Sequence, residues 1–315
     1  MMAWEPGATP ATLRARADLL RALRAFFDER GVLEVQTPVL GCHTVTEPAI
    51  ESLPLTVDSL EGWLQTSPEY FMKRLLAAGS GSIYQIGPVF RAGEQGRRHN
   101  PEFTLLEWYR VGFSLETLAA EVGDLVEEVL AGGRPQVAEY RELMQAHAGI
   151  DPWTDSAGVL AAQASKLSGI PEEQLERSEA LDLLMSGCVE PALAGKGPVI
   201  VRHYPPDQCA LAAVVEVGGV PAARRFELYL DGVEIGNAYE ELLDAAEQRQ
   251  RFNADDQRRR AAGQVMPEPD DRLLEALETG LPMCSGMAMG VDRLLMHQTG
   301  AQSLDQVMAF SRERL

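Results

Sequence analysis

Near its start the chain has a stretch whose apolar residues recur every three or four positions, which is typical of an amphipathic helix. These residues are Leu13, Ala17, Leu20, Leu23 and Phe27. Thr9 is a suitable N-cap, Pro10 suits the first helical position, and Gly31 suits the position after the C-cap. The sequence therefore predicts a helix that begins at Pro10 and ends just before Gly31.

The rest of the chain alternates between strand-like and helix-like patterns. Strands are predicted at 31–40 (ending near Pro38), 82–91, 103–111, 199–203, 211–217 and 224–241. Helices are predicted at 67–79, 115–131, 241–262 and 270–279, a final helix begins within 286–300, and the segment from about 136 to 198 is mainly helical. This order favours an α+β fold in which a largely antiparallel sheet is flanked by helices. No glycine-rich phosphate loop follows a strand, which disfavours P-loop and Rossmann folds.

Composition narrows the class of protein without identifying it. The chain has 315 residues and a hydrophobic content of 45%, enough for one large or two ordinary domains. No apolar run is long enough to cross a membrane, and the N-terminal segment lacks the pattern of a signal peptide. We therefore expect a cytoplasmic protein without membrane association. The four cysteines and five histidines are scattered, so neither a disulfide framework nor a zinc site is expected.

The charge of the chain bears on its partners. A net charge of −19 argues against a protein that binds nucleic acid through phosphates over a broad surface. It is compatible with a small anionic ligand in a local basic pocket, or with a basic protein partner. Charge alone does not choose between the two.

The segment "FELYLDGVEIG" at 226–236 predicts a β-hairpin. Asp231-Gly232 is a strong two-residue turn signal that pairs Leu230 with Val233 and places Leu228 opposite Ile235. Glu227 and Glu234 then become diagonal neighbours on the polar face, where like charges cost stability unless a cation lies between them. The pair is either a solvated face or, with phosphates nearby, a binding platform for Mg²⁺.

The stretch "FRAGEQGRRHNPEFTLLEWY" at 90–109 places many polar groups between two strand patterns. A solvated hairpin tip would explain an arbitrary charged loop. The second strand, however, alternates so that one face carries Phe103, Leu105, Glu107 and Tyr109. An anionic Glu107 beside a tyrosine hydroxyl packs poorly in a hydrophobic core but is well suited to bind an amine. Cations around such a carboxylate suit a reaction between a polyphosphate and an amino acid.

These segments resemble the motifs of class II aminoacyl-tRNA synthetases of the lysyl type. "RGVLEVQTPVL" at 30–40 resembles motif 1, the stretch at 90–109 resembles motif 2, and "GMAMGVDRLL" at 286–295 resembles motif 3. "ELYLDGVEIGNAYEE" at 227–241 resembles the strand before motif 3. The resemblance covers nearly the whole chain and implies a single catalytic domain, residues 1–315, with a mainly helical insertion at about 136–198.

Lysyl-tRNA synthetases also carry an N-terminal anticodon-binding domain, and none is expected here, because the motif 1 segment begins at residue 30 of the sequence. The chain is therefore similar to a truncated branch of the family, in which a ligase attaches lysine or (R)-β-lysine to elongation factor P, and tRNA is not expected as a partner. Ala288 stands where the family has a glycine beside the amino-acid pocket, which fits a preference for β-lysine over α-lysine. Motif 1 implies a homodimer.

The resemblance also implies the reaction and its residues. An ATP-dependent ligase would form an aminoacyl-adenylate and pyrophosphate, then release AMP when a lysine amine of the acceptor attacks. The residues implied to contact ATP are Arg91, Glu94, His99, Asn100, Phe103 and Arg293, of which Arg91 and Arg293 would be catalytic. Mg²⁺ would be held by Glu227 and Glu234. The amino acid would be bound by Glu69, Glu107, Tyr109, Asn237, Tyr239, Glu241 and Ala288.

One part of this assignment requires an irregular strand. Asn237, Tyr239 and Glu241 have the parity of the apolar face of the hairpin, so the alternation must break near Gly236, at a bulge. No general base for the transfer step is evident, and substrate-assisted deprotonation is one possibility.

Two other readings of the family resemblance stay open. The chain could form an adenylate for another acceptor, including tRNA or a small molecule, or it could be an idle paralogue that acts as a binding protein. The retention of both phosphate arginines and both metal carboxylates argues against an idle paralogue. The arginine-rich run at 249–260 is expected to form the exposed face of a helix.

Overall fold

The computed structural model describes residues 4–265 and 267–315. Residues 1–3, part of the N-terminal segment in which no signal peptide is expected, lie outside the described residues. The chain forms two compact units, Met1–Phe113 with Leu243–Leu315, and Ser114–Leu242. The expected single domain with a mainly helical insertion at about 136–198 stays a prediction.

The first unit contains a mostly antiparallel sheet in the order β1-β5-β6-β12. Only β1 runs parallel to its neighbour β5. A smaller sheet has the order β2-β4-β3. The strands are β1 (Leu33–Glu34), β2 (Leu40–Gly41), β3 (Leu53–Val57), β4 (Leu60–Leu64), β5 (Ile83–Phe90), β6 (Glu102–Val111) and β12 (Cys284–Gly290).

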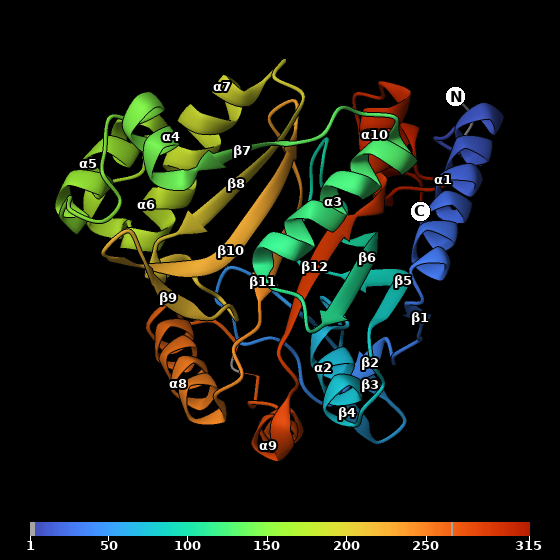
Figure 1. Cartoon of the computed structure of the whole chain (residues 1–315), viewed down its shortest axis with the longest axis horizontal. Helices are drawn as coiled ribbons and strands as arrows, with labels where there is room; N and C mark the ends of the chain where they lie inside the picture. The colour runs from blue at the N-terminus through green and yellow to red at the C-terminus, as the bar shows by residue number, and fades with distance from the viewer. Residues whose placement is uncertain (1–3, 266) are drawn as a thin grey trace. The chain divides into compact units, whose positions relative to one another are not determined.

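The helices of the first unit come from both ends of the sequence (Figure 1). They are α1 (Pro10–Glu29), α2 (Glu69–Ala77), α8 (Ala245–Ala261), α9 (Asp271–Gly280) and α10 (Val291–Thr299), with short 3₁₀ turns η4 (Leu304–Gln306) and η5 (Arg312–Arg314). Helix α1 contacts α10, and α9 contacts both α2 and α8. Thr9 caps α1 by accepting the Thr12 N–H at 3.1 Å, as the sequence predicts.

The second unit contains a sheet in the order β11-β10-β8-β7, with β9 also paired to β10. Only β7 and β8 run parallel. The strands are β7 (Gln136–Glu139), β8 (Pro198–Tyr204), β9 (Val214–Val217), β10 (Val220–Leu230) and β11 (Val233–Glu240). The helices are α3 (Leu115–Leu130), α4 (Tyr140–His147), α5 (Ala157–Ser168), η1 (Glu172–Gln174), α6 (Arg177–Leu184), η2 (Met185–Val189), α7 (Glu190–Leu193) and η3 (Pro206–Gln208).

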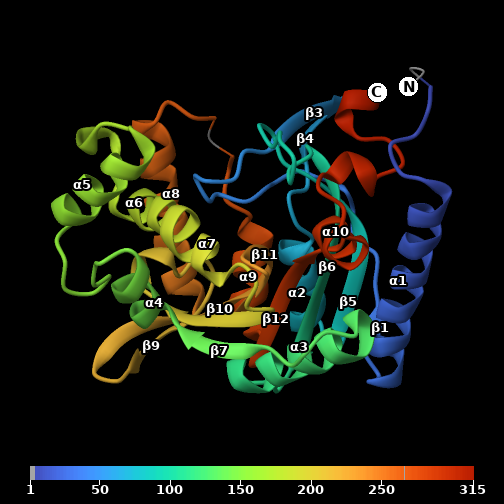
Figure 2. The same ribbon diagram turned by 90° about the horizontal axis from the view of Figure 1, so that it is seen from above.

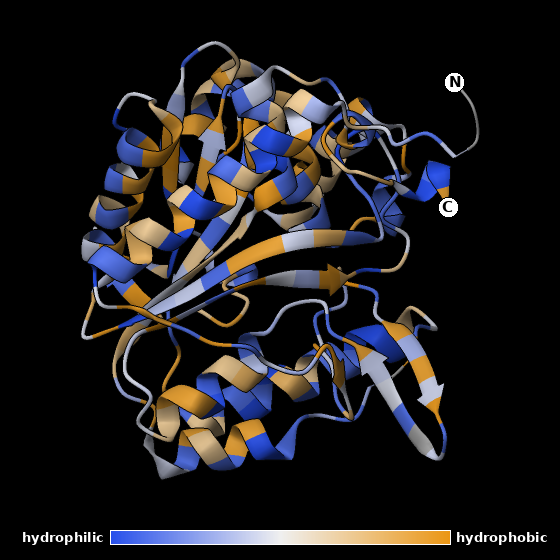
Figure 3. Cartoon of the chain, turned by 90° about the vertical axis from the view of Figure 1, so that its right-hand side faces the viewer, coloured by the Kyte–Doolittle hydropathy of each residue, from blue (hydrophilic) through white to orange (hydrophobic). Residues whose placement is uncertain are grey.

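The sheet of the second unit is covered on both faces (Figure 2). Val199 and Val201 of β8 enter a core formed with the helices between 140 and 193. Ile200 and Arg202, which have the opposite parity, line a pocket together with residues of α3. Hydrophobic and hydrophilic residues interleave along the elements, as expected for layers that each bury one side (Figure 3).

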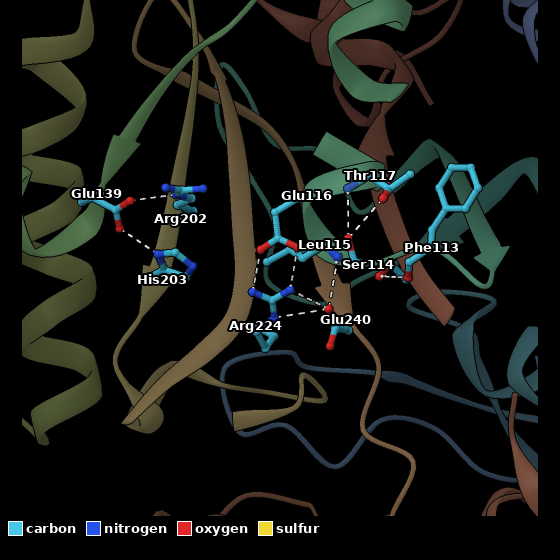
Figure 4. A network of polar contacts seen from close by, with 11 residues as sticks. Phe113, Ser114, Leu115, Glu116, Thr117, Glu139, Arg202, His203, Arg224 and Glu240 are labelled. Atoms are coloured by element: carbon cyan, nitrogen blue, oxygen red, sulfur yellow. Dashed lines mark hydrogen bonds and ion pairs between the residues drawn. The ribbon is translucent and has the colours of Figure 1, made fainter. Parts of the chain in front are cut away.

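A polar network fixes α3 to the hairpin strands of the same unit (Figure 4). Arg224 of β10 donates to both oxygens of Glu116 in α3, at 2.7 and 2.8 Å, and to Glu240 of β11 at 2.7 Å. The Glu240 carboxylate also accepts the N–H of Leu115. Hydrogen bonds from Arg224 lower the pKa of Glu116 to about 2, so this ion pair persists over most of the pH range.

Most predicted elements are confirmed, with two clear errors. The strand predicted at 31–40 is wrong in extent, because only Leu33–Glu34 and Leu40–Gly41 pair. In the run at 249–260, Arg259 is buried rather than exposed, since its guanidinium donates to the carbonyls of Thr46, Glu47 and Ile50. Among the residues that the structure describes, no helix is long and apolar enough to cross a membrane.

Candidate active site

The β10–β11 hairpin has the turn that the sequence predicts, followed by a bulge. Leu230 pairs with Val233 and Tyr229 with Glu234, but the register then shifts by one residue at Ile235. Leu228 therefore lies opposite Gly236, and the predicted pairing of Leu228 with Ile235 is wrong. The predicted break near Gly236 is confirmed.

The bulge changes which side chains share a face. Beyond it, Asn237 lies opposite Glu227, and Tyr239 lies opposite Arg225. Directly paired residues project to the same side of a sheet, so Asn237 and Tyr239 join Glu227 and Glu234 on one face. Glu241 follows in a bridge with Ala212 and is 3% exposed.

Glu227 is surrounded by hydrogen-bond donors. The hydroxyls of Tyr204 and Tyr229 both donate to its Oε2, and Nη2 of Arg225 donates to its Oε1. Arg225 is itself held by the carbonyl of Gln208 at 2.7 Å. Burial, together with the charge of Glu227, holds the pKa of both phenols well above its ordinary value, so both tyrosines remain donors.

The donor set of this face fits Mg²⁺. Two tyrosine hydroxyls occupy both lone pairs of Glu227 Oε2, and Arg225 occupies one lone pair of Oε1, which leaves the second lone pair of Oε1 for a cation. Magnesium typically takes one or two protein carboxylates and completes its shell with phosphate oxygens and water. The described residues contain no group of three or more His, Cys, Asp or Glu side chains that could hold a metal unaided. Glu227 and Glu234 therefore suit a cation that arrives with phosphates.

In the first unit Glu107 is a buried carboxylate that accepts a hydroxyl on each of its oxygens. It lies on β6, is 2% exposed, and accepts the Tyr109 hydroxyl on Oε1 at 2.7 Å and the Ser67 hydroxyl on Oε2 at 2.7 Å. Ala288 of β12 is its direct cross-strand partner. The methyl group of Ala288 therefore lies on the same face of the sheet as Glu107.

Glu69 begins α2 and is paired with a buried lysine. Lys73 Nζ lies 2.6 Å from Glu69 Oε1 one helical turn away, and Lys73 is 2% exposed. The backbone N–H of Glu69 donates to the Ser67 hydroxyl oxygen at 3.0 Å. Both the backbone and the side chain of Glu69 are thus held in place.

Arg91 follows β5 and lies over an aromatic ring. Its guanidinium carbon is 5.1 Å from the centre of the Phe103 ring, and its Nε donates to the Thr66 carbonyl at 3.4 Å. A second nitrogen lies 3.9 Å from Glu94. Arg91 and Phe103 therefore form one surface on which a planar base and a phosphate could both bind.

His99 joins the two motif segments of the first unit. Arg293, in the first turn of α10, places Nη2 2.8 Å from Nε2 of His99, and its Nε donates to the Arg98 carbonyl at 3.3 Å. Glu94 Oε2 is 3.7 Å from the same imidazole nitrogen. Burial and the positive charge of Arg293 lower the pKa of His99, which favours the neutral ring.

Asn100 stabilises the loop between β5 and β6. It is buried, its amide nitrogen donates to the Glu102 carbonyl at 2.7 Å, and its Oδ1 accepts the Arg312 N–H at 2.9 Å. These bonds hold the loop against the C-terminal segment. A contact between Asn100 and ATP stays a prediction.

Comparison with known proteins identifies the family. The model of the tRNA synthetases of class II (D, K and N) matches residues 4–314. The chain belongs to this class II synthetase family. The expected fold class, an antiparallel sheet flanked by helices, is thereby confirmed.

Within the class II synthetase family, the chain is similar to proteins named elongation factor P–(R)-β-lysine ligase. It is 42% identical over 319 residues to the one from Hamiltonella defensa, covering 99% of this chain and 98% of that protein. It is 44% identical over 314 residues to the one from Mannheimia succiniciproducens, covering 98% and 97%. It is 43% identical over 322 residues to the one from Edwardsiella ictaluri, covering 100% and 99%.

The structure thus forms separate groups from the residues that the class II synthetase motifs imply. One group contains Arg91, Glu94, His99, Phe103 and Arg293. In another, Glu69 and Glu107 both hydrogen-bond to Ser67, and Tyr109 joins them through Glu107. The residues that sequence reasoning missed are the supporting ones: Ser67, Lys73, Tyr204 and Arg225. Lys73 could have been found from its position one helical turn after Glu69, whereas the others depend on tertiary contacts.

Proposed function

We propose that the protein activates a lysine-type diamino acid with ATP and transfers it to a lysine side chain of elongation factor P. Relatives that match almost the full chain carry the name of that ligase. The observation that carries the amino-acid part is Glu107, a carboxylate 2% exposed, with a tyrosine hydroxyl and a serine hydroxyl on its two oxygens. A buried carboxylate of this kind suits an ammonium group, which is costly to bury without a partner.

Activation joins the substrate carboxylate to the α-phosphate of ATP. A carboxylate oxygen attacks the α-phosphorus, a new P–O bond forms, and the bond to pyrophosphate breaks. Negative charge gathers on the phosphate oxygens, so fixed cations contribute most to catalysis. We assign Arg91 to the α-phosphate and the substrate carboxylate, Arg293 to the γ-phosphate, and Phe103 to stacking on adenine, with Glu94 and His99 as further contacts.

The second unit supplies the carboxylates for a cation. We assign Mg²⁺ to Glu227 and Glu234, where Tyr204, Tyr229 and Arg225 orient the Glu227 carboxylate. Bound there, Mg²⁺ would neutralise phosphate charge. Arg225 keeps the Glu227 charge compensated before the nucleotide arrives, which offsets the repulsion between the two glutamates.

The amines of the substrate are assigned to carboxylates. Glu107, Tyr109 and Glu241 would bind the ε-amine, and Glu69 the other amine. We assign Asn237 to the substrate carboxylate, Tyr239 to the pocket wall, and Ala288 to the choice of (R)-β-lysine over α-lysine.

Transfer completes the reaction. The ε-amine of an acceptor lysine attacks the carbonyl carbon of the adenylate, an amide bond forms, and AMP leaves. We assign deprotonation of the incoming amine to the substrate itself, through the departing phosphate. The proposal includes a cytoplasmic homodimer, which light scattering would test against a monomeric mass.

Exchange of labelled pyrophosphate into ATP tests the activation step. We expect exchange that depends on lysine or (R)-β-lysine and on Mg²⁺. Absence of exchange with either amino acid would favour the idle paralogue. Exchange without transfer to elongation factor P would favour another acceptor, so tRNA should be included in the acceptor assay.

A further inference from the structure

Ser67 lies between the two carboxylates that face the substrate amines in the proposed function. Its hydroxyl donates to Glu107 Oε2 at 2.7 Å, and the same oxygen accepts the backbone N–H of Glu69 at 3.0 Å. Glu107 lies on β6, forty residues after Ser67 in the sequence, whereas Glu69 begins α2, two residues after Ser67. A single hydroxyl therefore connects two elements that carry opposite ends of the proposed amine-binding arrangement.

We propose that Ser67 is a positioning residue that sets the distance between Glu69 and Glu107, and thereby determines which spacing of two amines the protein accepts. This inference rests on the proposed function, since it takes both carboxylates as amine partners. Ser67 itself touches neither the reacting carboxylate nor the phosphate in this account.

The contacts around Ser67 leave little freedom in either carboxylate. Lys73 Nζ holds the Glu69 side chain at 2.6 Å, and the Ser67 hydroxyl oxygen holds the Glu69 backbone N–H at 3.0 Å. Tyr109 holds Oε1 of Glu107 at 2.7 Å, so Ser67 completes the restraint on Oε2. Pro68, between Ser67 and Glu69, has a ring-restricted φ of −77°. Removal of the hydroxyl would loosen both carboxylates at once.

The segment around Ser67 also explains why the effect would stay local. The carbonyl of Gln65 accepts the N–H of Phe90 at 2.9 Å, and the carbonyl of Thr66 accepts Nε of Arg91 at 3.4 Å. Both contacts use backbone carbonyls of the segment and not the Ser67 side chain, so a change of that side chain leaves them in place. The position of Arg91, and with it the proposed ATP contacts, should therefore be retained when the hydroxyl is removed.

The substrates that distinguish this role differ in the separation of their amines. The two amines of β-lysine are one methylene closer together than those of α-lysine. A rigid pair of carboxylates discriminates between these separations, whereas a loosened pair adapts to both. Discrimination between two substrates that differ by one methylene is modest, roughly tenfold. The loss of a single positioning hydrogen bond can change binding by a similar factor.

The test compares Ser67→Ala with Ser67→Thr, which keeps the hydroxyl, and with Ser114→Ala, which removes a hydroxyl from the start of α3. Calorimetric binding of each lysine and pyrophosphate exchange are measured, with thermal unfolding as a check on folding. For Ser67→Ala we expect the Kd and KM of the preferred lysine to rise about tenfold, the ratio between the two lysines to move toward one, and kcat and the KM for ATP to stay within about twofold. Ser67→Thr and Ser114→Ala should stay close to the wild type.

Three results would overturn the inference. An unchanged ratio between the lysines in Ser67→Ala would remove the positioning role, and so would an equal rise in the KM for ATP. A Ser67→Thr protein that unfolds normally but behaves like Ser67→Ala would do the same. If the wild type binds neither lysine, the inference fails together with the proposed substrate. If binding is normal but exchange is absent, the proposed reaction fails, and the binding data still decide the role of Ser67.

Discussion

Arg293 Nη2 and His99 Nε2 lie 2.8 Å apart, although 194 residues separate them in the chain. A guanidinium can only donate, so the imidazole nitrogen accepts and carries no proton. His99 is therefore neutral in this arrangement, with its proton on Nδ1. This contact links the motif 2 loop to the first turn of α10, and a protonated ring would break it.

The pKa of His99 should lie below its ordinary value, because burial and Arg293 disfavour the charged ring. Arg91 and Arg98 act in the same direction, and Glu94 opposes them. Replacing Arg293 with alanine removes the nearest cation, so the His99 pKa should rise toward about 6.5. NMR titration of the imidazole measures this, with Arg21→Ala, an exposed arginine of α1, as the control.

The lowered pKa of His99 also predicts how the stability of the folded protein changes with pH. Between the two pKa values the unfolded chain binds more protons at this residue than the folded chain, so the free energy of unfolding decreases as the pH falls below about 6.5. Urea unfolding at successive pH values should show a smaller decrease in His99→Gln. An identical pH dependence in both proteins would contradict the neutral assignment.

Glu107→Gln should reduce lysine-dependent kcat/KM by roughly 100-fold, because a charge-assisted hydrogen bond to the ammonium is lost. Tyr109→Phe keeps the Glu107 charge and removes the hydroxyl that orients this carboxylate and that the proposal assigns to the ε-amine, so a smaller loss of about tenfold is expected. Pyrophosphate exchange at varied lysine concentrations checks both, with the exposed Glu61→Gln as control. Full activity of Glu107→Gln would show that the amine binds elsewhere.

Glu227→Gln and Glu234→Gln should differ in stability while sharing a loss of activity. Glu227→Gln leaves Arg225 buried without its counter-charge, which costs about 3 kcal/mol of unfolding free energy. Glu234 is only partly buried, and its replacement should cost less than about 1 kcal/mol. Both variants should need more Mg²⁺ for pyrophosphate exchange. Equal stability of the two, measured by chemical denaturation, would argue against the Arg225 pair.

Ala288→Gly should change the choice of amino acid more than the rate. The methyl group lies directly opposite Glu107 across β6 and β12, so its removal enlarges the space beside the amine partner. We expect the ratio of kcat/KM for β-lysine over α-lysine to fall by about tenfold. The comparison should be made below the melting transition, since a glycine in a strand costs ~0.5–1 kcal/mol. An unchanged ratio would remove Ala288 from the specificity account.

Local patterns predicted the elements well where a cap, a turn or an alternation set them. Thr9 marks the start of α1 and Gly31 follows its end, and Asp231-Gly232 sets the register of the hairpin. The break predicted near Gly236, which in the structure is a bulge at Ile235, came from a different argument. The roles implied for Asn237 and Tyr239 are incompatible with a regular strand, and a glycine within a strand is a common site of a bulge.

The supporting contacts could not be predicted because they join residues distant in sequence. Tyr204 reaches Glu227 from another strand, and Arg259 is buried by carbonyls more than two hundred residues away. Asp292 of motif 3 accepts hydrogen bonds from Arg16 of α1 and from the Thr104 N–H, so it stabilises the fold beside Arg293. A single sequence does not show whether a charged residue is exposed to solvent or buried in an ion pair.

The intact mass of elongation factor P tests the central claim most directly. The acceptor is incubated with this protein, ATP, Mg²⁺ and (R)-β-lysine, in parallel with α-lysine, and with Arg293→Ala and Arg21→Ala proteins. The account predicts the mass gain of one lysine residue with (R)-β-lysine, lost with Arg293→Ala and kept with Arg21→Ala. No mass gain with either amino acid, despite lysine-dependent pyrophosphate exchange, would contradict elongation factor P as the acceptor.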